Sequence, residues 1–122
     1  EKDGFCGIHA DFSHHDHLGL ERRVNLLYYL NENWKDSYKG NLSLYDQNLI
    51  SVKSYQPIDN RCIIFTTSDD SFHGHPEPLN TPDGYCRRSV ALYYYTVPTE
   101  TRKKKRILYP EDPNWKYSML KE

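Results

Sequence analysis

The sequence predicts an all-β domain, and three observations carry that prediction. Short apolar runs alternate with turn residues at the spacing typical of β-sandwiches and barrels. Eleven of the 122 residues are tyrosine, which is common in strands because its ring packs against the sheet while its hydroxyl reaches a polar partner. A helical pattern occurs only near the C-terminus, where Asp112 could cap a helix with Pro113 in its first turn and residues 115–121 following.

The first half of the chain is expected to contain four strands. Residues 4–11 form the first strand and precede a polar turn at 16–19. Residues 22–31 (RRVNLLYYLN) give the strongest strand signal, because six of these ten side chains are aliphatic or tyrosine. Residues 41–46 and 50–56 follow as shorter strands.

The second half is expected to contain three extended segments. A turn at 57–60, which begins with proline and ends with asparagine, leads into a strand over 61–67 (RCIIFTT). A brief extended piece surrounds Phe72 and His73. After a loop rich in proline and glycine, residues 86–96 (CRRSVALYYYT) form the last strand.

Two of these strands, 22–31 and 86–96, carry apolar side chains on both faces. Strands of this kind lie between a second sheet and a further covering layer. The chain has almost no amphipathic helix that could supply such a layer. We therefore expect an upstream segment or a companion chain to complete the fold, so that this sequence is part of a larger protein.

Composition argues against several classes of protein. Sixteen basic and 17 acidic side chains leave a formal charge of −1, which lacks the positive footprint of a general nucleic-acid binder. No apolar run approaches the ~20 residues that a membrane span needs, and no secretory segment precedes the first strand. The cysteines, Cys6, Cys62 and Cys86, form no CxxC pair, and their odd number favours reduced thiols. We expect a cytoplasmic protein that binds neither nucleic acid nor membrane.

His9 and Asp11 form an H-x-D pair in the first strand. The alternation of side chains along a strand puts both on one face, and either His73 or His75 could supply a third ligand. Two imidazoles and one carboxylate suit a divalent iron that is held on one triangular face, with the opposite positions open.

Arg87 and Ser89 lie two residues apart in the last strand and therefore share a face. A guanidinium fork and a hydroxyl at this spacing could bind a carboxylate, and Tyr29 could add a phenolic donor. A salt bridge at the edge of the strand is the structural alternative. However, an arginine inside a buried strand needs a buried anion, and the carboxylate of a ligand meets that need.

Two further patterns have a plainer interpretation. His14, His15 and His17 could chelate zinc or nickel together with Asp16, but a polar turn beside the mouth of the site is the more common use of such a cluster. The basic run at 101–106 (TRKKKR) lacks interleaved aromatic residues and is interpreted as a solvated linker.

Four motifs together resemble a known family. They are HAD at 9–11, RRVNLLYYLN at 22–31, the Phe72-His73 pair, and RRSVALYY at 87–94. Their order is similar to that of the iron(II)- and 2-oxoglutarate-dependent dioxygenases, and the YYLN sequence resembles the prolyl-hydroxylase-like branch most. The resemblance spans residues 4–96.

This resemblance implies a double-stranded β-helix, a jelly roll of eight strands that would here lack its first strand and its supporting helices. Residues 1–96 would be the jelly-roll core, the C-terminal part of a larger catalytic domain, and residues 97–122 a basic, partly helical extension. Among the residues of the motifs, the resemblance implies that His9, Asp11 and His73 bind iron. It also implies that Arg87 binds the distal carboxylate of 2-oxoglutarate, assisted by Tyr29 and Ser89.

The implied activity is the hydroxylation of an unactivated C–H bond with iron(II), 2-oxoglutarate and dioxygen, and with ascorbate as a candidate reductant. Asp11 favours hydroxylation, because halogenating relatives lack this carboxylate. A prolyl residue of a protein or peptide is the expected substrate. Two alternatives stay open: the same chemistry on a small molecule (an amino acid, sugar or nucleotide), and a non-catalytic, cupin-like binding module.

Local chemistry favours His73 over His75 as the third ligand. His75 lies between Gly74, which loosens the backbone, and Pro76, which forces a turn or a strand end, whereas a metal ligand needs a fixed rotamer. His73 follows Phe72, where the resembling family places its ligand. His75 is then expected at the mouth of the site.

Overall fold

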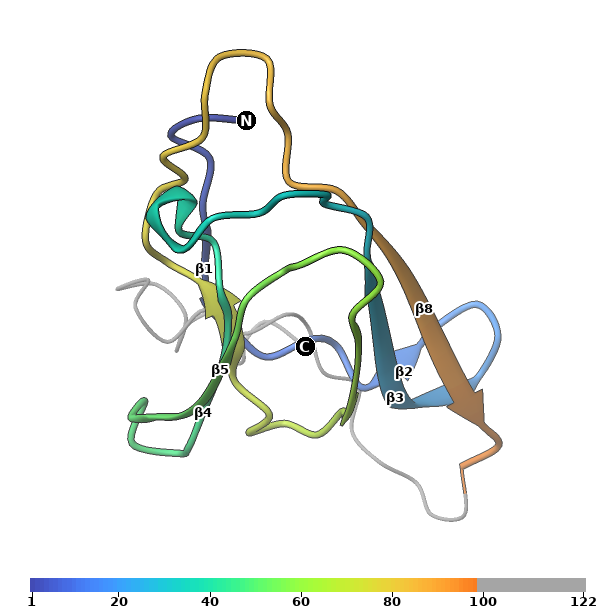
Figure 1. Cartoon of the computed structure of the whole chain (residues 1–122). Coiled ribbons are helices and arrows are strands. Elements are labelled where there is room, and N and C mark those ends of the chain that lie inside the picture. The colour runs from blue at the N-terminus through green and yellow to red at the C-terminus, as the bar shows by residue number, and fades with distance from the viewer. Residues whose placement is uncertain (99–122) are drawn as a thin grey trace.

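Two antiparallel sheets make up the part of the chain that the structure, a computed structural model, describes, namely residues 1–98 (Figure 1). Short strands joined by turns and loops form both sheets. In chain order the elements are β1 (Cys6–His9), β2 (His14–His15), β3 (Leu20–Tyr29), the 3₁₀ helix η1 (Asp36–Tyr38), β4 (Leu42–Tyr45), β5 (Ser51–Tyr55), β6 (Cys62–Thr66), β7 (His73–His75) and β8 (Ser89–Thr96). The prediction of an all-β domain is confirmed for this part of the chain.

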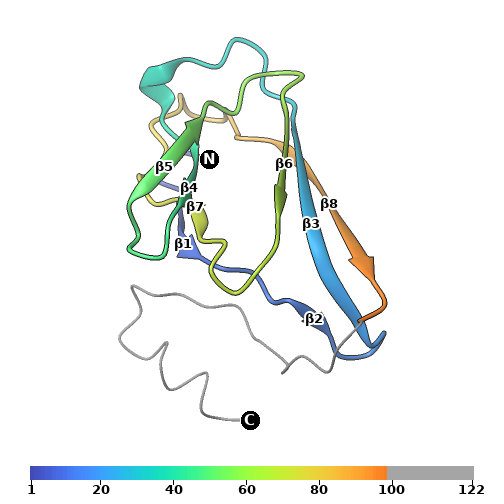
Figure 2. The same ribbon diagram turned by 90° about the horizontal axis from the view of Figure 1, so that it is seen from below.

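The chain crosses repeatedly between the two sheets. One sheet has the strand order β1-β7-β4-β5. In the other, β3 is central and pairs with β8 along one edge and with β6 and the short β2 along the other. Figure 2 shows the two sheets facing each other. The arrangement is that of a β-sandwich, compatible with a jelly roll.

Each of the seven expected strand regions contains a strand, but one further strand was not expected, and the strand bounds differ from the prediction by up to three residues. β2 lies in the histidine cluster, which we expected to be only a polar turn. His14 and His15 pair with Glu21 and Leu20, because the turn at residues 16–19 folds the chain back on itself as a small hairpin. The last strand begins at Ser89, so Arg87 lies in the preceding loop and not in the strand.

The core lies between the two sheets. Tyr29, Leu42 and Ile63 form a buried cluster that joins β3, β4 and β6, and partly buried side chains such as Phe65 pack against it. A second buried cluster of Ile8, Ala10 and Phe72 lies near the ends of β1 and β7. This layer of inward side chains fixes the distance between the sheets and therefore positions every candidate functional residue.

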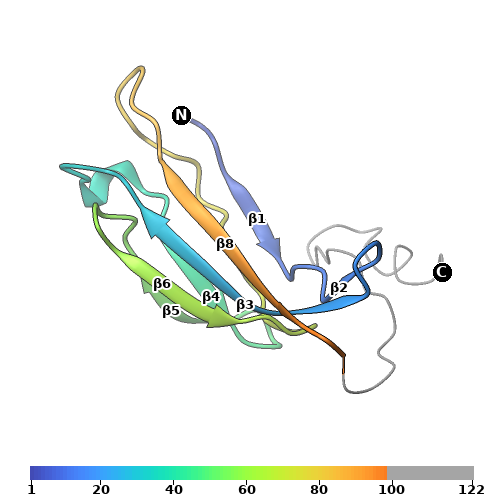
Figure 3. The same ribbon diagram turned by 90° about the vertical axis from the view of Figure 1, so that its right-hand side faces the viewer.

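The outward face of the β6-β3-β8 sheet is apolar and exposed. Ile64 retains 64% of its accessible surface, Leu92 47% and Val90 46%, and the strand register puts Leu26 directly between Ile64 and Leu92. Figure 3 shows β8, β3 and β6 side by side with β4 and β5 behind them. No element within residues 1–98 covers this face, so the covering layer that we expect from elsewhere stays a prediction.

Three expectations concern the C-terminal part of the chain. The helix over 115–121 and the basic run at 101–106 lie outside the described residues, as does nearly all of the extension expected over 97–122. Within the described range, the structure has no helix with the length and apolar character that crossing a membrane would require.

The adjacent residues Ile63 and Ile64 test which face of β6 is buried. Ile63 is 6% exposed and belongs to the core, whereas Ile64 points outward. We expect Ile63→Ala to lower the free energy of unfolding by about 2–5 kcal/mol, because it leaves a cavity between the sheets. Ile64→Ala should change it by less than about 0.5 kcal/mol. Urea denaturation of both variants measures the difference, and an equal loss at Ile64 would show that its face is also covered.

Candidate metal centre

Three side chains meet where β1 ends and β7 begins. The antiparallel pairing of these strands places His9 opposite His73, with the ring centroids 4.4 Å apart. Asp11 follows β1 and points back toward both: its Oδ1 lies 3.5 Å from His9 Nε2, and its Oδ2 lies 3.5 Å from His73 Nε2. One ligand atom from each residue lies within 4.8 Å of the other two. The three residues could therefore bind one metal ion.

Both imidazoles are oriented by backbone carbonyls. His9 Nδ1 lies 2.8 Å from the carbonyl oxygen of Gly7, and His73 Nδ1 lies 2.9 Å from that of Ser71. A carbonyl can only accept a hydrogen bond, so each Nδ1 must carry the proton. In the neutral ring, Nε2 then keeps its lone pair and faces Asp11. This is the usual preparation of a histidine for binding metal.

Charge within the group is balanced without a metal. Burial alone would raise the pKa of Asp11, but His9, His73, Arg22 and Asn25 together lower it to about 2. Burial alone would lower the pKa of His9, yet its interactions with Asp11, Cys6 and Gly7 raise it to about 10. His73 differs, because burial dominates and lowers its pKa. Asp11 is thus ionised at neutral pH, and the proton on His9 compensates its charge.

Arg22 and Asn25, which the sequence did not single out, also contact this group. Asn25 Nδ2 donates to Asp11 Oδ2 at 2.7 Å, and Arg22 Nη2 lies 3.0 Å from the same oxygen. Strict alternation along β3 would put these two residues on opposite faces. The sequence pattern therefore did not predict that both contact Asp11. One signal was present: charge at the start of an otherwise apolar strand needs a buried partner.

The candidate carboxylate site is only partly assembled as predicted. Arg87 Nη2 donates to Tyr29 Oη at 3.3 Å, and the guanidinium carbon lies 5.0 Å from the centre of the Tyr29 ring. Arg87 Nε donates to the carbonyl oxygen of Gly40 at 2.9 Å. Tyr29 is fully buried, and burial raises its pKa. Ser89 lies opposite Tyr29 in the β3–β8 register, but it is exposed.

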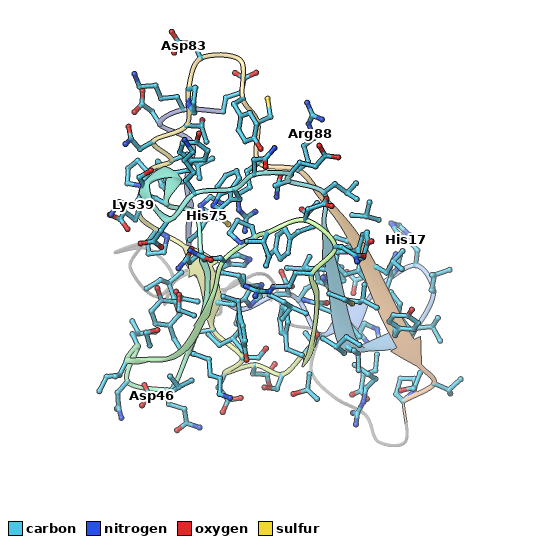
Figure 4. The ribbon with its side chains drawn as sticks, in the orientation of Figure 1. His17, Lys39, Asp46, His75, Asp83 and Arg88 are labelled. Atoms are coloured by element: carbon cyan, nitrogen blue, oxygen red, sulfur yellow. The ribbon has the colours of Figure 1, made fainter. Side chains whose placement is uncertain are left out.

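Arg88 and His75 lie close in sequence to the favoured residues Arg87 and His73, but their side chains have different environments. Arg88 is exposed, and its side chain projects away from the ribbon (Figure 4). Its backbone is held by two hydrogen bonds with the Asn31 side chain. His75 is not among the three residues that could bind a metal. Burial, and next the charge of Arg87, lower its pKa to about 4, so it is neutral at physiological pH.

The histidine cluster does not form a second centre. His15 makes edge contacts with the rings of His17 and Tyr95, at 6.2 and 5.9 Å between centroids. Within residues 1–98, His9, Asp11 and His73 are the one group of three His, Cys, Asp or Glu residues whose ligand atoms are close enough to hold an ion. The interpretation of 16–19 as a turn is confirmed.

Comparison with known proteins gives one match. The model of a family described as the 2OG-Fe(II) oxygenase superfamily matches residues 1–95 of the 122. This region contains all six candidate site residues and most of β8. No curated protein matches the chain, and no solved structure does so.

The raised pKa of His9 predicts a pH dependence of the metal-free protein. Its folded-state pKa of about 10 exceeds the ordinary value of 6.5, so the contribution of His9 to stability is complete below pH 6.5 and is lost as the pH rises toward 10. We expect wild type to lose stability relative to His9→Gln over this range. Urea denaturation in a chelator between pH 6 and 10 measures the difference. Parallel curves would contradict the His9–Asp11 pairing.

Proposed function

The chain belongs to the 2OG-Fe(II) oxygenase superfamily, and we propose that it hydroxylates an unactivated C–H bond, using iron(II), 2-oxoglutarate and dioxygen. One observation carries the proposal: the layer between the sheets holds both a His-Asp-His group and an arginine with a tyrosine. Phe65 links them, since it packs against the Tyr29 cluster and its ring lies 4.8 Å from that of His73.

We propose that the sheets are those of a double-stranded β-helix that lacks its first strand. Strands β3, β6 and β8 lie in one sheet and β4, β5 and β7 in the other, as in a jelly roll whose strands alternate between sheets. Residues 1–96 would form the core and residues 97–122 an extension. An upstream segment or a companion chain would supply the missing strand and cover the exposed apolar face.

The proposed roles follow from the donor atoms. His9, Asp11 and His73 would bind iron(II) through two imidazole nitrogens and one carboxylate oxygen, a donor set that suits this ion. When bound, iron(II) with 2-oxoglutarate and dioxygen would supply the oxidising power, and the cosubstrate would leave as succinate and carbon dioxide. Ascorbate would serve as a reductant that keeps the iron in the iron(II) state.

The protein would hold the cosubstrate and exclude water. Arg87 would pair with the distal carboxylate of 2-oxoglutarate, and the Tyr29 hydroxyl, already beside the guanidinium, would donate to the same carboxylate. Ser89 would assist from the next strand. Leu42 and Ile63 around Tyr29 keep this region dry, which strengthens a charge-assisted contact.

We further propose a prolyl residue of a protein or peptide as the substrate and the cytoplasm as the place of action. The YYLN sequence at the end of β3, similar to the prolyl-hydroxylase-like branch, supports the substrate. The three free cysteines support a reducing compartment.

An anaerobic titration of the full chain with iron(II) and 2-oxoglutarate tests the reaction class. We expect a weak visible charge-transfer band when both are present, because it requires both to bind one centre. Its absence would favour the cupin-like binding module. Succinate formation with prolyl peptides, compared with free amino acids, sugars and nucleotides, then tests the substrate class.

Arg87→Ala should raise the KM for 2-oxoglutarate and leave iron affinity nearly unchanged. Loss of a charge-assisted contact in a desolvated pocket costs about 2–5 kcal/mol, so a rise of roughly 30-fold or more is expected. Arg88→Ala is the matched control, because that side chain is exposed. Steady-state succinate assays measure both variants, and equal effects would mean that the wrong arginine has been assigned.

His73→Ala should abolish iron binding, whereas His75→Ala should retain it. His73 Nε2 faces Asp11 and His9, while His75 stands outside the group. Equilibrium binding of iron(II) under anaerobic conditions, with circular dichroism to verify folding, measures the effect. Retained binding in a folded His73→Ala protein, with loss in His75→Ala, would reverse the assignment.

A further inference from the structure

The Asp11 carboxylate is held on one side by β3, the central strand of the facing sheet. Asn25 Nδ2 and Arg22 Nη2 contact Oδ2 at 2.7 and 3.0 Å. Oδ1 lies 3.5 Å from His9 Nε2, and Oδ2 also lies 3.5 Å from His73 Nε2. The two oxygens of this carboxylate therefore have different environments before any metal binds.

A β-bulge brings Arg22 to this position. In the β3–β8 ladder Arg22 pairs with Tyr95 and Val24 with Tyr94, so Arg23 has no partner and the register shifts. An extra residue reverses the face on which the preceding side chains lie. Arg22, which regular alternation would place outward with Val24, thus shares the inner face with Asn25. Its side chain is 4% exposed.

Aromatic rings and polar groups surround the guanidinium of Arg22. The guanidinium carbon lies 3.8 Å from the centre of the Tyr93 ring and 4.9 Å from that of Phe12. In the plane of the group, Nε donates to Asn25 Oδ1 at 2.9 Å while Nη2 contacts Asp11. Two aromatic rings and two polar partners therefore restrict the guanidinium.

Asn25 has only one consistent orientation. Its Oδ1 accepts from Arg22 Nε and, at 3.3 Å, from the Thr67 hydroxyl. Arginine can only donate, so the oxygen must face Arg22 and the amide nitrogen must face Asp11. Asn25 is 2% exposed. Both ends of this amide are therefore used, and it acts as a fixed donor to the carboxylate.

We propose that Arg22 and Asn25 are positioning residues that occupy Oδ2 of Asp11 and present Oδ1 to the metal. A carboxylate that binds through one oxygen takes one coordination position, so the sites opposite the three protein ligands stay open for cosubstrate and dioxygen. This role rests on the proposed function, because it assumes that Asp11 is a ligand. It adds Arg22 and Asn25 to the residues of the site.

The test uses Co(II) as an air-stable probe of the full chain. Arg22→Lys keeps the charge but loses the fork, and Asn25→Ser removes the amide group that donates to Asp11. We expect each to weaken Co(II) binding roughly 10- to 100-fold. Arg23→Gln is the matched control, since Arg23 is exposed and pairs with Glu21, and it should bind Co(II) as wild type does.

Urea denaturation of the metal-free variants separates positioning from stability. If Arg22 and Asn25 only stabilise the fold, the variants lose unfolding free energy but still bind Co(II) with wild-type affinity below their transitions, and the proposal fails. Weaker Co(II) binding by both folded variants, with Arg23→Gln unchanged, supports it. If wild type itself binds no Co(II), the proposed function fails before this inference is reached.

Discussion

The close antiparallel pairing of β1 with β7 is the contact on which the candidate site depends. It brings together His9 and His73, which are 64 residues apart in the chain. Gly74 permits this approach, because a Cβ there would lie 2.7 Å from the carbonyl oxygen of Gly7 and 2.9 Å from that of Cys6. Any larger residue would push the strands apart and separate the imidazoles. The site therefore depends on Gly74, although this residue has no side chain that could bind a metal.

β3 is the second organising element, since one strand serves both halves of the site. Arg22 and Asn25 of this strand contact Asp11, and its last residue, Tyr29, contacts Arg87. A regular strand advances by about 3.3 Å per residue, so the separation between the carboxylate of the metal group and the arginine is set by strand length. The bulge at Arg23 alters only the start of β3 and leaves the pairing from Val24 to Tyr29 regular. β3 thus combines a local bulge at its start with regular pairing along the rest of its length.

Charge in the inter-sheet layer is arranged so that Asp11 stays ionised despite its burial. Four neighbours stabilise its negative charge, and the proton on His9 compensates that charge. Metal and proton therefore compete for His9, because only the neutral imidazole has a lone pair for coordination. The same layer buries Tyr29 completely beside the Arg87 guanidinium. One inter-sheet layer thus contains both the His-Asp-His group and the arginine–tyrosine pair.

The sequence by itself determined the strand content and most of the candidate residues. Alternation and turn residues located seven of the eight strands within residues 1–98 and missed the two-residue β2, because both signals are local. The H-x-D pair with a later histidine predicted the donor set. Only the tertiary structure decided that His73 and not His75 lies opposite His9, since this depends on the register between two distant strands. It also placed Arg87 before β8, left Ser89 exposed and turned Arg22 inward. The physical reason is that bulges, strand ends and registers arise from pairing between segments. The alternation of side chains within a single segment does not encode that pairing.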